Sequence, residues 1–128
     1  MNPLEKHLIS YEQALALKKL GFDEPCFGGY DMETLKLWIG YLNDGEQFNR
    51  EYYYPAPTYS QAFRWFRKKY NLKSWVEEYT KNKYIYEIRP HKITDYKEGE
   101  IYVYATYEEA EIACLNKLIE IVKEKKNG

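Results

Sequence analysis

One short phrase occurs three times in this chain at equal intervals, and it indicates where three helices begin. The copies span Ser10–Ala14, Thr58–Ala62 and Thr106–Ala110, and their caps lie 48 residues apart (58 − 10 and 106 − 58). Each is a capping box. The Ser or Thr side-chain oxygen accepts a hydrogen bond from the backbone amide of the third helical residue, and the Gln or Glu side chain of that residue accepts one from the backbone amide of the cap. A fixed period predicts a repeated supersecondary unit, although hairpins that lead into capped helices would give equal spacing by chance.

Between the first two helix starts the sequence predicts one helix and two or three strands. The first helix is expected over residues 11–20, because Gly21 follows and glycine readily takes the left-handed conformation that ends helices. Residues 35–41 alternate as a strand does. Asn43–Glu46 contains an Asp-Gly turn leading into a returning strand over 47–54, which ends at Pro55 and Pro57. If residues 25–30 also form a strand, the period is a helix and three antiparallel strands.

The second period contains the clearest helix, expected to begin at residue 59. Its core positions, at i, i+3, i+4, i+7 and i+11, are Tyr59, Ala62, Phe63, Phe66 and Tyr70. Strands are expected over 74–79, 83–89 and 101–105, with a turn at 80–82 and a loop over 91–100. A third helix from 107 to about 125 has a fraying tail over 123–128. Its inward residues are Tyr107, Ala110, Cys114, Leu118, Ile121 and Val122.

These elements together predict an αβββ-αβββ-α pseudo-repeat. We expect a single α+β domain over residues 1–128, with an antiparallel sheet that carries helices on one face. A chain of 128 residues can bury one core without disulfides or a metal.

The charge distribution and the two cysteines bear on where the protein acts and on what it can bind. The net charge is −1, but residues 60–92 carry nine Lys/Arg against three Asp/Glu, and both flanking segments are acidic. The two cysteines, Cys26 and Cys114, lie far apart without the dense pattern of a secreted disulfide scaffold. With no leader and no long apolar run in the sequence, we expect a cytoplasmic protein that does not contact membranes.

Tyrosine is the compositional outlier, at 15 of 128 residues. Tyrosines suit the half-buried surface of a sheet, which is the simpler interpretation. They also suit interfaces, so a homo-oligomer is a second expectation.

Catalysis is disfavoured by the residues available, so we expect no enzyme activity, no cofactor and no metal. Ser10 and Ser60 belong to helix starts, and Cys114 lies on an inward stripe. Cys26 is a loop thiol that would react only if exposed near positive charge. The two histidines, His7 and His91, are too few and too far apart in sequence for a metal-ligand pair.

The strongest binding feature lies on the second helix, opposite its core stripe. Gln61, Arg64, Trp65 and Lys68 fall within about 100° of one another there. A Trp beside two cations can stack a base and contact phosphate, which predicts a site for a nucleotide-like ligand or nucleic acid. The competing interpretation is that a strand or a subunit covers Trp65.

Three segments of the chain are distinctive: Ser-Tyr-Glu-Gln-Ala-Leu-Ala-Leu-Lys-Lys-Leu-Gly-Phe-Asp-Glu-Pro-Cys over 10–26, Ala-Pro-Thr-Tyr-Ser-Gln-Ala-Phe-Arg-Trp-Phe-Arg over 56–67, and Thr-Tyr-Glu-Glu-Ala-Glu-Ile-Ala-Cys-Leu over 106–115. With these segments the chain resembles a family of small uncharacterised proteins encoded by phages and prophages of gut bacteria. The resemblance implies an accessory protein of a mobile element that acts in the cytoplasm of a bacterial host, and it carries no activity.

The function expected from the sequence is therefore non-catalytic binding. The protein would bind a small, nucleotide-like ligand or a host protein, in counter-defence. The alternative is nucleic-acid binding through the basic segment 60–92.

Overall fold

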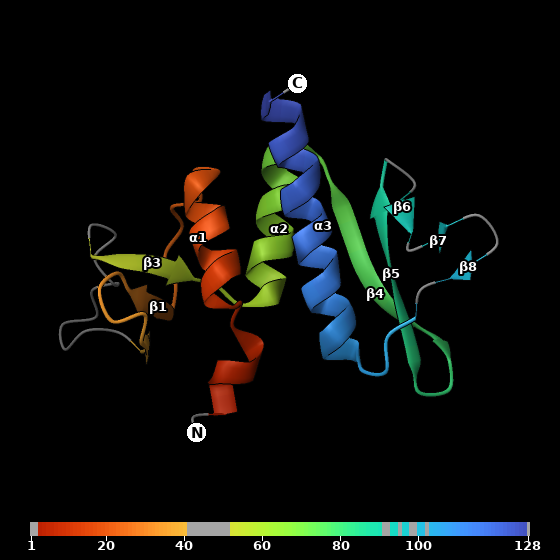
Figure 1. Cartoon of the computed structure of the whole chain (residues 1–128), viewed down its shortest axis with the longest axis horizontal. Coiled ribbons are helices and arrows are strands. Elements are labelled where there is room, and N and C mark those ends of the chain that lie inside the picture. Colours follow the sequence, from red (N-terminus) through yellow and green to blue (C-terminus); the bar gives the residue numbers. More distant parts are fainter. Residues whose placement is uncertain are drawn as a thin grey trace. The chain divides into compact units, whose positions relative to one another are not determined.

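The structure, a computed structural model, describes residues 3–40, 52–90, 93–94, 96–97, 100–101 and 103–127. Three α-helices and antiparallel strands confirm the predicted α+β class (Figure 1). The chain forms two compact units, Met1–Ala62 and Phe63–Gly128, and the boundary falls inside α2 (Tyr59–Tyr70). The strands that the structure describes form two three-stranded sheets and a two-stranded one instead of the single sheet expected.

The first unit opens with a 3-10 helix, η1 (Pro3–His7), and helix α1 (Tyr11–Lys19). Both bonds of the predicted capping box are present: Gln13 N donates to Ser10 Oγ at 3.2 Å, and Ser10 N donates to Gln13 Oε1 at 3.2 Å. The helix ends where expected, since Gly21 has a φ of 99°. The sequence prediction is confirmed for this helix and both of its ends.

The sheet of the first unit has a different strand order from the one expected. It contains β1 (Gly28–Asp31), β2 (Leu37–Ile39) and β3 (Tyr53–Ala56) in the order β2-β1-β3. We expected segments 35–41 and 47–54 to pair with each other, but β1 lies between them. Tyr41, the turn at Asn43–Glu46 and residues 47–51 lie outside the described part of the chain.

Two boundaries of this sheet correct the sequence prediction. Leu35 has a φ of 62° and belongs to the turn between β1 and β2, not to a strand. Pro55 does not end the returning strand: it pairs with Gly29 inside β3. Proline is tolerated there because β3 is an edge strand among the described residues, so its missing N–H removes no ladder bond on the outer side.

In the first unit, α1 packs on the face of the sheet that carries Tyr30 and Tyr54. The Tyr11 ring meets those two rings edge-on, with centroids 5.9 and 5.7 Å away. The Tyr30 hydroxyl donates to Ile9 O at 2.7 Å. A Cβ on Gly28 would lie 2.6 Å from Leu8 Cδ1, so any larger residue there would force the buried Leu8 side chain to shift.

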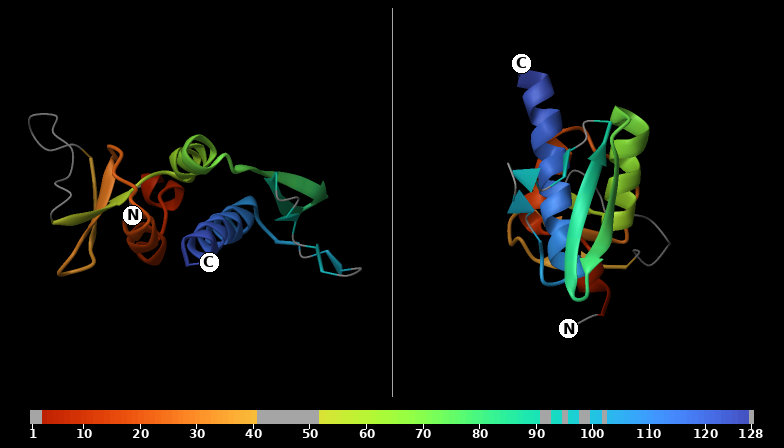
Figure 2. Two further views of the ribbon diagram at one scale, coloured as in Figure 1. Left: turned by 90° about the horizontal axis from the view of Figure 1, so that it is seen from above. Right: turned by 90° about the vertical axis from the view of Figure 1, so that its right-hand side faces the viewer.

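The second unit continues from α2 into β4 (Lys73–Thr80) and β5 (Lys83–Arg89), which pair antiparallel. The turn predicted between them is present, and Asn82 takes a φ of 62°. Strand β6 (Ile93–Thr94) adds to the other side of β5. Helix α3 (Tyr107–Asn127) packs along β4 and β5, as both Figure 1 and Figure 2 show.

The strand expected over 101–105 is not formed as one strand. Instead β8 (Glu100–Ile101) pairs with β7 (Tyr96–Lys97), and all of these residues except Ile101 lie in the segment expected to be a loop. Among the described residues of this segment, Tyr104 continues the sheet, because it exchanges two backbone hydrogen bonds with Tyr84, of 2.9 and 2.8 Å. His91 and the Glu98-Gly99 pair of this segment lie outside the described residues.

Helix α3 begins at Tyr107 as predicted and continues to Asn127, two residues past the expected end. The fraying expected over residues 123–128 stays a prediction. Tyr107 is 44% exposed and does not face the core, because it occupies the first helical turn; the inward stripe begins at Ala110. The remaining inward residues are buried as predicted: Ala110, Cys114, Leu118, Ile121 and Val122.

Both periods begin with a helix that leads into antiparallel strands, but the first has three described strands and the second has five, and the strands are arranged differently. The first strand of the period is central in β2-β1-β3 and at the edge in β4-β5-β6. The caps differ as well: Gln61 N donates to Thr58 Oγ1 at 3.1 Å, but the Gln61 side chain donates elsewhere. The equal spacing therefore predicts where the helices start, but it does not mean that the strands of the two periods are arranged alike.

The third cap supports a direct stability test. Glu109 N donates to Thr106 Oγ1 at 3.1 Å. We expect Thr106→Ala to lower the free energy of unfolding by about 1 kcal/mol, because that amide loses its acceptor. Thr106→Ser keeps the oxygen and should stay within about 0.5 kcal/mol of the wild type in chemical denaturation. Equal losses in both variants would contradict the capping role.

Candidate functional site

The predicted stacking platform on α2 is not available, because Trp65 is only 6% exposed. Its ring lies edge-on to Phe66 and Tyr70, with centroids 5.0 and 5.5 Å away. The expectation that Trp65 faces solvent or a partner is therefore wrong. The buried face of α2 includes Trp65, which the spacing rule placed outside it, because burying the large indole ring is more favourable than leaving it in water. Phe63, which was expected in the core, is only half-buried.

Gln61 is tied to the first unit and does not join the other predicted site residues. Its Nε2 donates to Pro25 O at 2.8 Å and to Glu24 Oε1 at 3.2 Å. These bonds fasten the first turn of α2 to the segment that precedes β1. Its role in the structure is to position a helix end.

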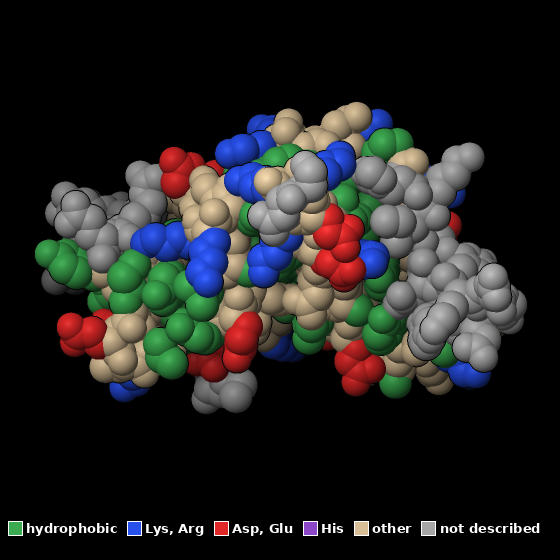
Figure 3. All heavy atoms as spheres, turned by 45° about the horizontal axis from the view of Figure 1, so that its top comes forward, with side chains coloured by type: hydrophobic (Ala, Val, Ile, Leu, Met, Phe, Trp, Pro, Cys, Tyr) green, Lys and Arg blue, Asp and Glu red, His purple; other side chains and the backbone are tan. Residues whose placement is uncertain are grey.

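Arg64, Arg67 and Lys68 form an exposed cationic stripe on α2. Their spacing of three and four residues places them on one side of the helix. In the part of the chain that the structure describes, no carboxylate forms an ion pair with them. Lys and Arg side chains are blue at the molecular surface in Figure 3. The stripe can attract an anionic partner, and the prediction of exposure is confirmed for Arg64 and Lys68.

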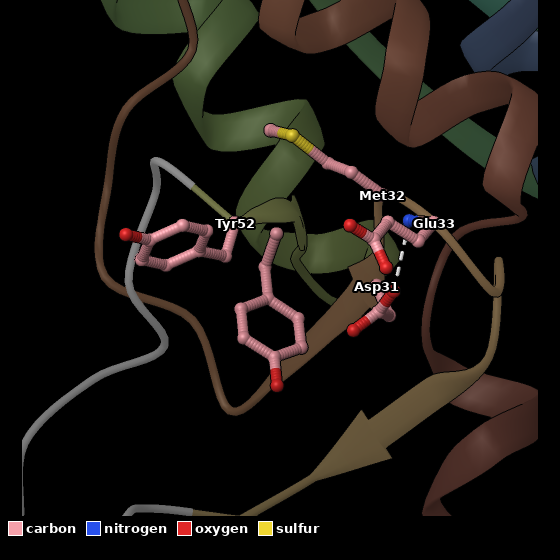
Figure 4. A pocket seen from close by; sticks show the side chains of 5 residues that line it. Asp31, Met32, Glu33 and Tyr52 are labelled. Atoms are coloured by element: carbon pink, nitrogen blue, oxygen red, sulfur yellow. Dashed lines mark hydrogen bonds between the residues drawn. The ribbon is translucent and has the colours of Figure 1, made fainter.

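A cavity of about 510 Å³ lies in the first unit, at the end of β1 and the start of β3. Its lining residues are Asp31, Met32, Glu33, Tyr52 and Tyr53. Figure 4 shows the carboxylates of Asp31 and Glu33 on one side and the Tyr52 ring on the other. We call this the Asp31 pocket. Tyr52 is 63% exposed, so its ring is accessible to a ligand.

The local sequence explains how the Asp31 pocket forms. Asp31 Oδ1 accepts the amides of Glu33 at 2.8 Å and Thr34 at 2.9 Å, which is an Asx turn at the end of β1. The turn fixes the direction of the chain at residues 31–34. Met32 N then donates to Tyr52 O at 3.1 Å, and Asp31 pairs with Tyr53 across the sheet. Two tyrosines are thereby held beside two carboxylates.

Hydrogen bonding keeps the Asp31 carboxylate charged. The backbone amides of Thr34 and Glu33 lower the pKa of Asp31 below its ordinary value of 3.8. The pocket therefore holds a negative charge at neutral pH, next to electron-rich ring faces. Carboxylates and tyrosine rings together favour ammonium groups and other hydrogen-bond donors over phosphates.

This pKa shift predicts a pH dependence of stability. Because the folded-state pKa of Asp31 is lowered, its stabilising effect is complete above the unfolded carboxyl pKa and is lost as pH falls through the folded value. Asp31→Asn retains an acceptor for the turn but cannot titrate. We expect the unfolding free energy of the wild type to fall more steeply than that of the variant as the pH is lowered below about 4, the ordinary carboxyl pKa. Identical slopes in denaturant titrations would contradict the assignment.

Neither thiol is accessible at the surface. Cys114 and Cys26 are buried, and Cys26 Sγ donates to Glu24 O at 3.3 Å. Among the described residues, no three His, Cys, Asp or Glu side chains gather as a metal site would require. No helix in the described ranges is long and apolar enough to cross a membrane.

Sequence reasoning missed the Asp31 pocket. The available signal was Asp31 followed by Thr34 in a break between apolar runs, which is typical of an Asx turn. The approach of Tyr52 depends on the pairing of β1 with β3, which the sequence pattern did not indicate. Comparison with known proteins found no matching family model, no matching curated protein and no matching solved structure.

Proposed function

We propose that this protein acts by binding and not by catalysis. In this proposal it is a phage-type accessory protein in the cytoplasm of a bacterial host, where it holds a small ligand or covers a host protein in counter-defence. The phage origin rests on the resemblance of segments 10–26, 56–67 and 106–115. The binding role rests on the Asp31 pocket.

The chemistry of the pocket supports a small ligand that carries amino groups. The carboxylates of Asp31 and Glu33 accept hydrogen bonds from such groups, and the exposed Tyr52 ring can cover an aromatic or cationic part of the ligand. A nucleotide-like ligand would contact the pocket through its base and ribose, because two carboxylates repel phosphates.

Native mass spectrometry of the full chain purified from a bacterial host tests this proposal. We expect the wild type to retain a small molecule that the double variant Glu33→Gln/Tyr52→Ala has lost, since both side chains are exposed and line the pocket. The matched control is Tyr79→Ala/Glu124→Gln, which changes the same residue types at exposed positions outside the lining. Equal retention by both double variants would contradict the site.

The alternative function is nucleic-acid binding through residues 60–92, which the cationic stripe favours. If Lys68 contacts a phosphate, Lys68→Ala should reduce the slope of log K against log salt by about 0.9. The control is Lys123→Ala, which removes an exposed lysine of α3. Wild-type retention on heparin that is unchanged by Lys68→Ala would count against this function.

A further inference from the structure

Strand β4 offers a long, exposed edge in the second unit. It has eight residues and lies at the end of the order β4-β5-β6. The side chains of Lys73, Trp75 and Glu77 share one face of the strand, and all three are exposed; Trp75 is 40% exposed. Edge strands of this length are usually covered or shortened. Figure 2 shows β4 and β5 side by side.

The directions of the backbone groups on this edge follow from β5. The N–H of Tyr84 donates to Tyr104 O and its C=O accepts from Tyr104 N, so both groups point away from β4. Tyr84 is paired with Glu78, and backbone directions alternate along a strand. In β4, therefore, the even-numbered residues Ser74, Val76 and Glu78 direct their N–H and C=O groups to the outer edge.

We propose that the outer edge of β4 pairs antiparallel with the same edge of a second copy of this chain, about a twofold axis at Trp75. In this register Ser74 of one copy exchanges backbone hydrogen bonds with Val76 of the other. Trp75 lies opposite Trp75 of the second copy. Lys73 lies opposite Glu77 at both ends of the pairing, at non-hydrogen-bonded positions, where cross-strand side chains come closest.

Charge complementarity selects this register over its neighbours. The backbone directions allow the twofold axis to lie at any residue of β4, and the axes that pair most of this eight-residue strand lie near its centre, at residues 75, 76 and 77. An axis at Glu77 places two glutamates opposite each other, which is repulsive. An axis at Val76 places Trp75 against Glu77 and leaves Lys73 without a directly opposite acid. Only the axis at Trp75 forms two ion pairs around an aromatic pair.

Charge reversal tests the pairing in the full chain by sedimentation equilibrium. The wild type should be a dimer, and Lys73→Glu should raise the dimer dissociation constant about tenfold or more, since two attractive pairs become repulsive. The swapped variant Lys73→Glu/Glu77→Lys should restore the dimer. A wild type that is monomeric at its highest soluble concentration overturns the proposal, as does a dimer that Lys73→Glu leaves intact.

Cysteine variants test the register itself. Trp75→Cys should form a disulfide-linked dimer on mild oxidation, because residue 75 faces its own copy at a distance that a disulfide spans. Glu77→Cys is the matched control and should remain unlinked, since it faces Lys73. The native Cys26 and Cys114 are buried and do not compete. Linking through position 77 but not 75 would overturn the register.

Discussion

We expect Trp65→Ala to lower the free energy of unfolding by about 3–5 kcal/mol and to leave nucleotide titrations unchanged. The reason is that Trp65 is buried against Phe66 and Tyr70, so its truncation opens a cavity and removes two aromatic contacts. Lys69 also loses the ring beneath its ammonium group, which lies 5.4 Å from the Trp65 centroid. Urea denaturation followed by far-UV circular dichroism measures the loss.

The matched control for this prediction is Arg64→Ala, one position earlier on α2. Arg64 is exposed and should change stability by no more than about 0.5 kcal/mol. If Trp65→Ala folded with wild-type stability and lost affinity for a nucleotide, the buried placement would be wrong and the stacking platform would stand.

The second large effect is expected for Leu17→Ala, in the core of the first unit. Leu17 is fully buried on α1, so its truncation should cost about 2–5 kcal/mol. We expect the loss to destabilise α1 and α3 alike, since α2 runs without a break across the boundary between the units. Amide hydrogen exchange in both helices measures whether the chain unfolds as the single domain that the sequence predicts.

The pattern of exchange separates the two outcomes. If the chain is one cooperative domain, amides of α1 and α3 lose protection by similar factors in Leu17→Ala. Loss of protection confined to the first unit would contradict the single-domain prediction and make residues 1–62 and 63–128 separate folding units.

Local signals in this sequence predict helices well. The cap at Ser10 and the glycine after Leu20 fix α1 because each satisfies backbone groups that a helix end leaves unpaired. The turn before Lys83 is likewise local, since Asn82 accepts the positive φ that it needs. Such features depend on residues a few positions apart, and they were predicted correctly.

Pairing between distant segments was not predictable from the same signals. The placement of β1 between β2 and β3 depends on which faces pack together, and alternation of residue types does not encode this order. Trp65 shows the same limit on a helix, because its burial depends on neighbouring rings and not on its angle to the stripe. The Asp31 pocket combines a local turn, which the sequence indicates, with Tyr52, which only the tertiary pairing brings near.

Amide NMR titration of the full chain tests most directly whether the Asp31 pocket binds ligands that carry amino groups. We expect the amides of Glu33, Thr34 and Tyr53 to shift on addition of putrescine or adenosine, and to shift less with adenosine monophosphate, whose phosphate the carboxylates repel. Unchanged amides at these positions with all three compounds, or shifts centred instead on Arg64–Lys68 with the phosphate compound alone, would contradict the claim.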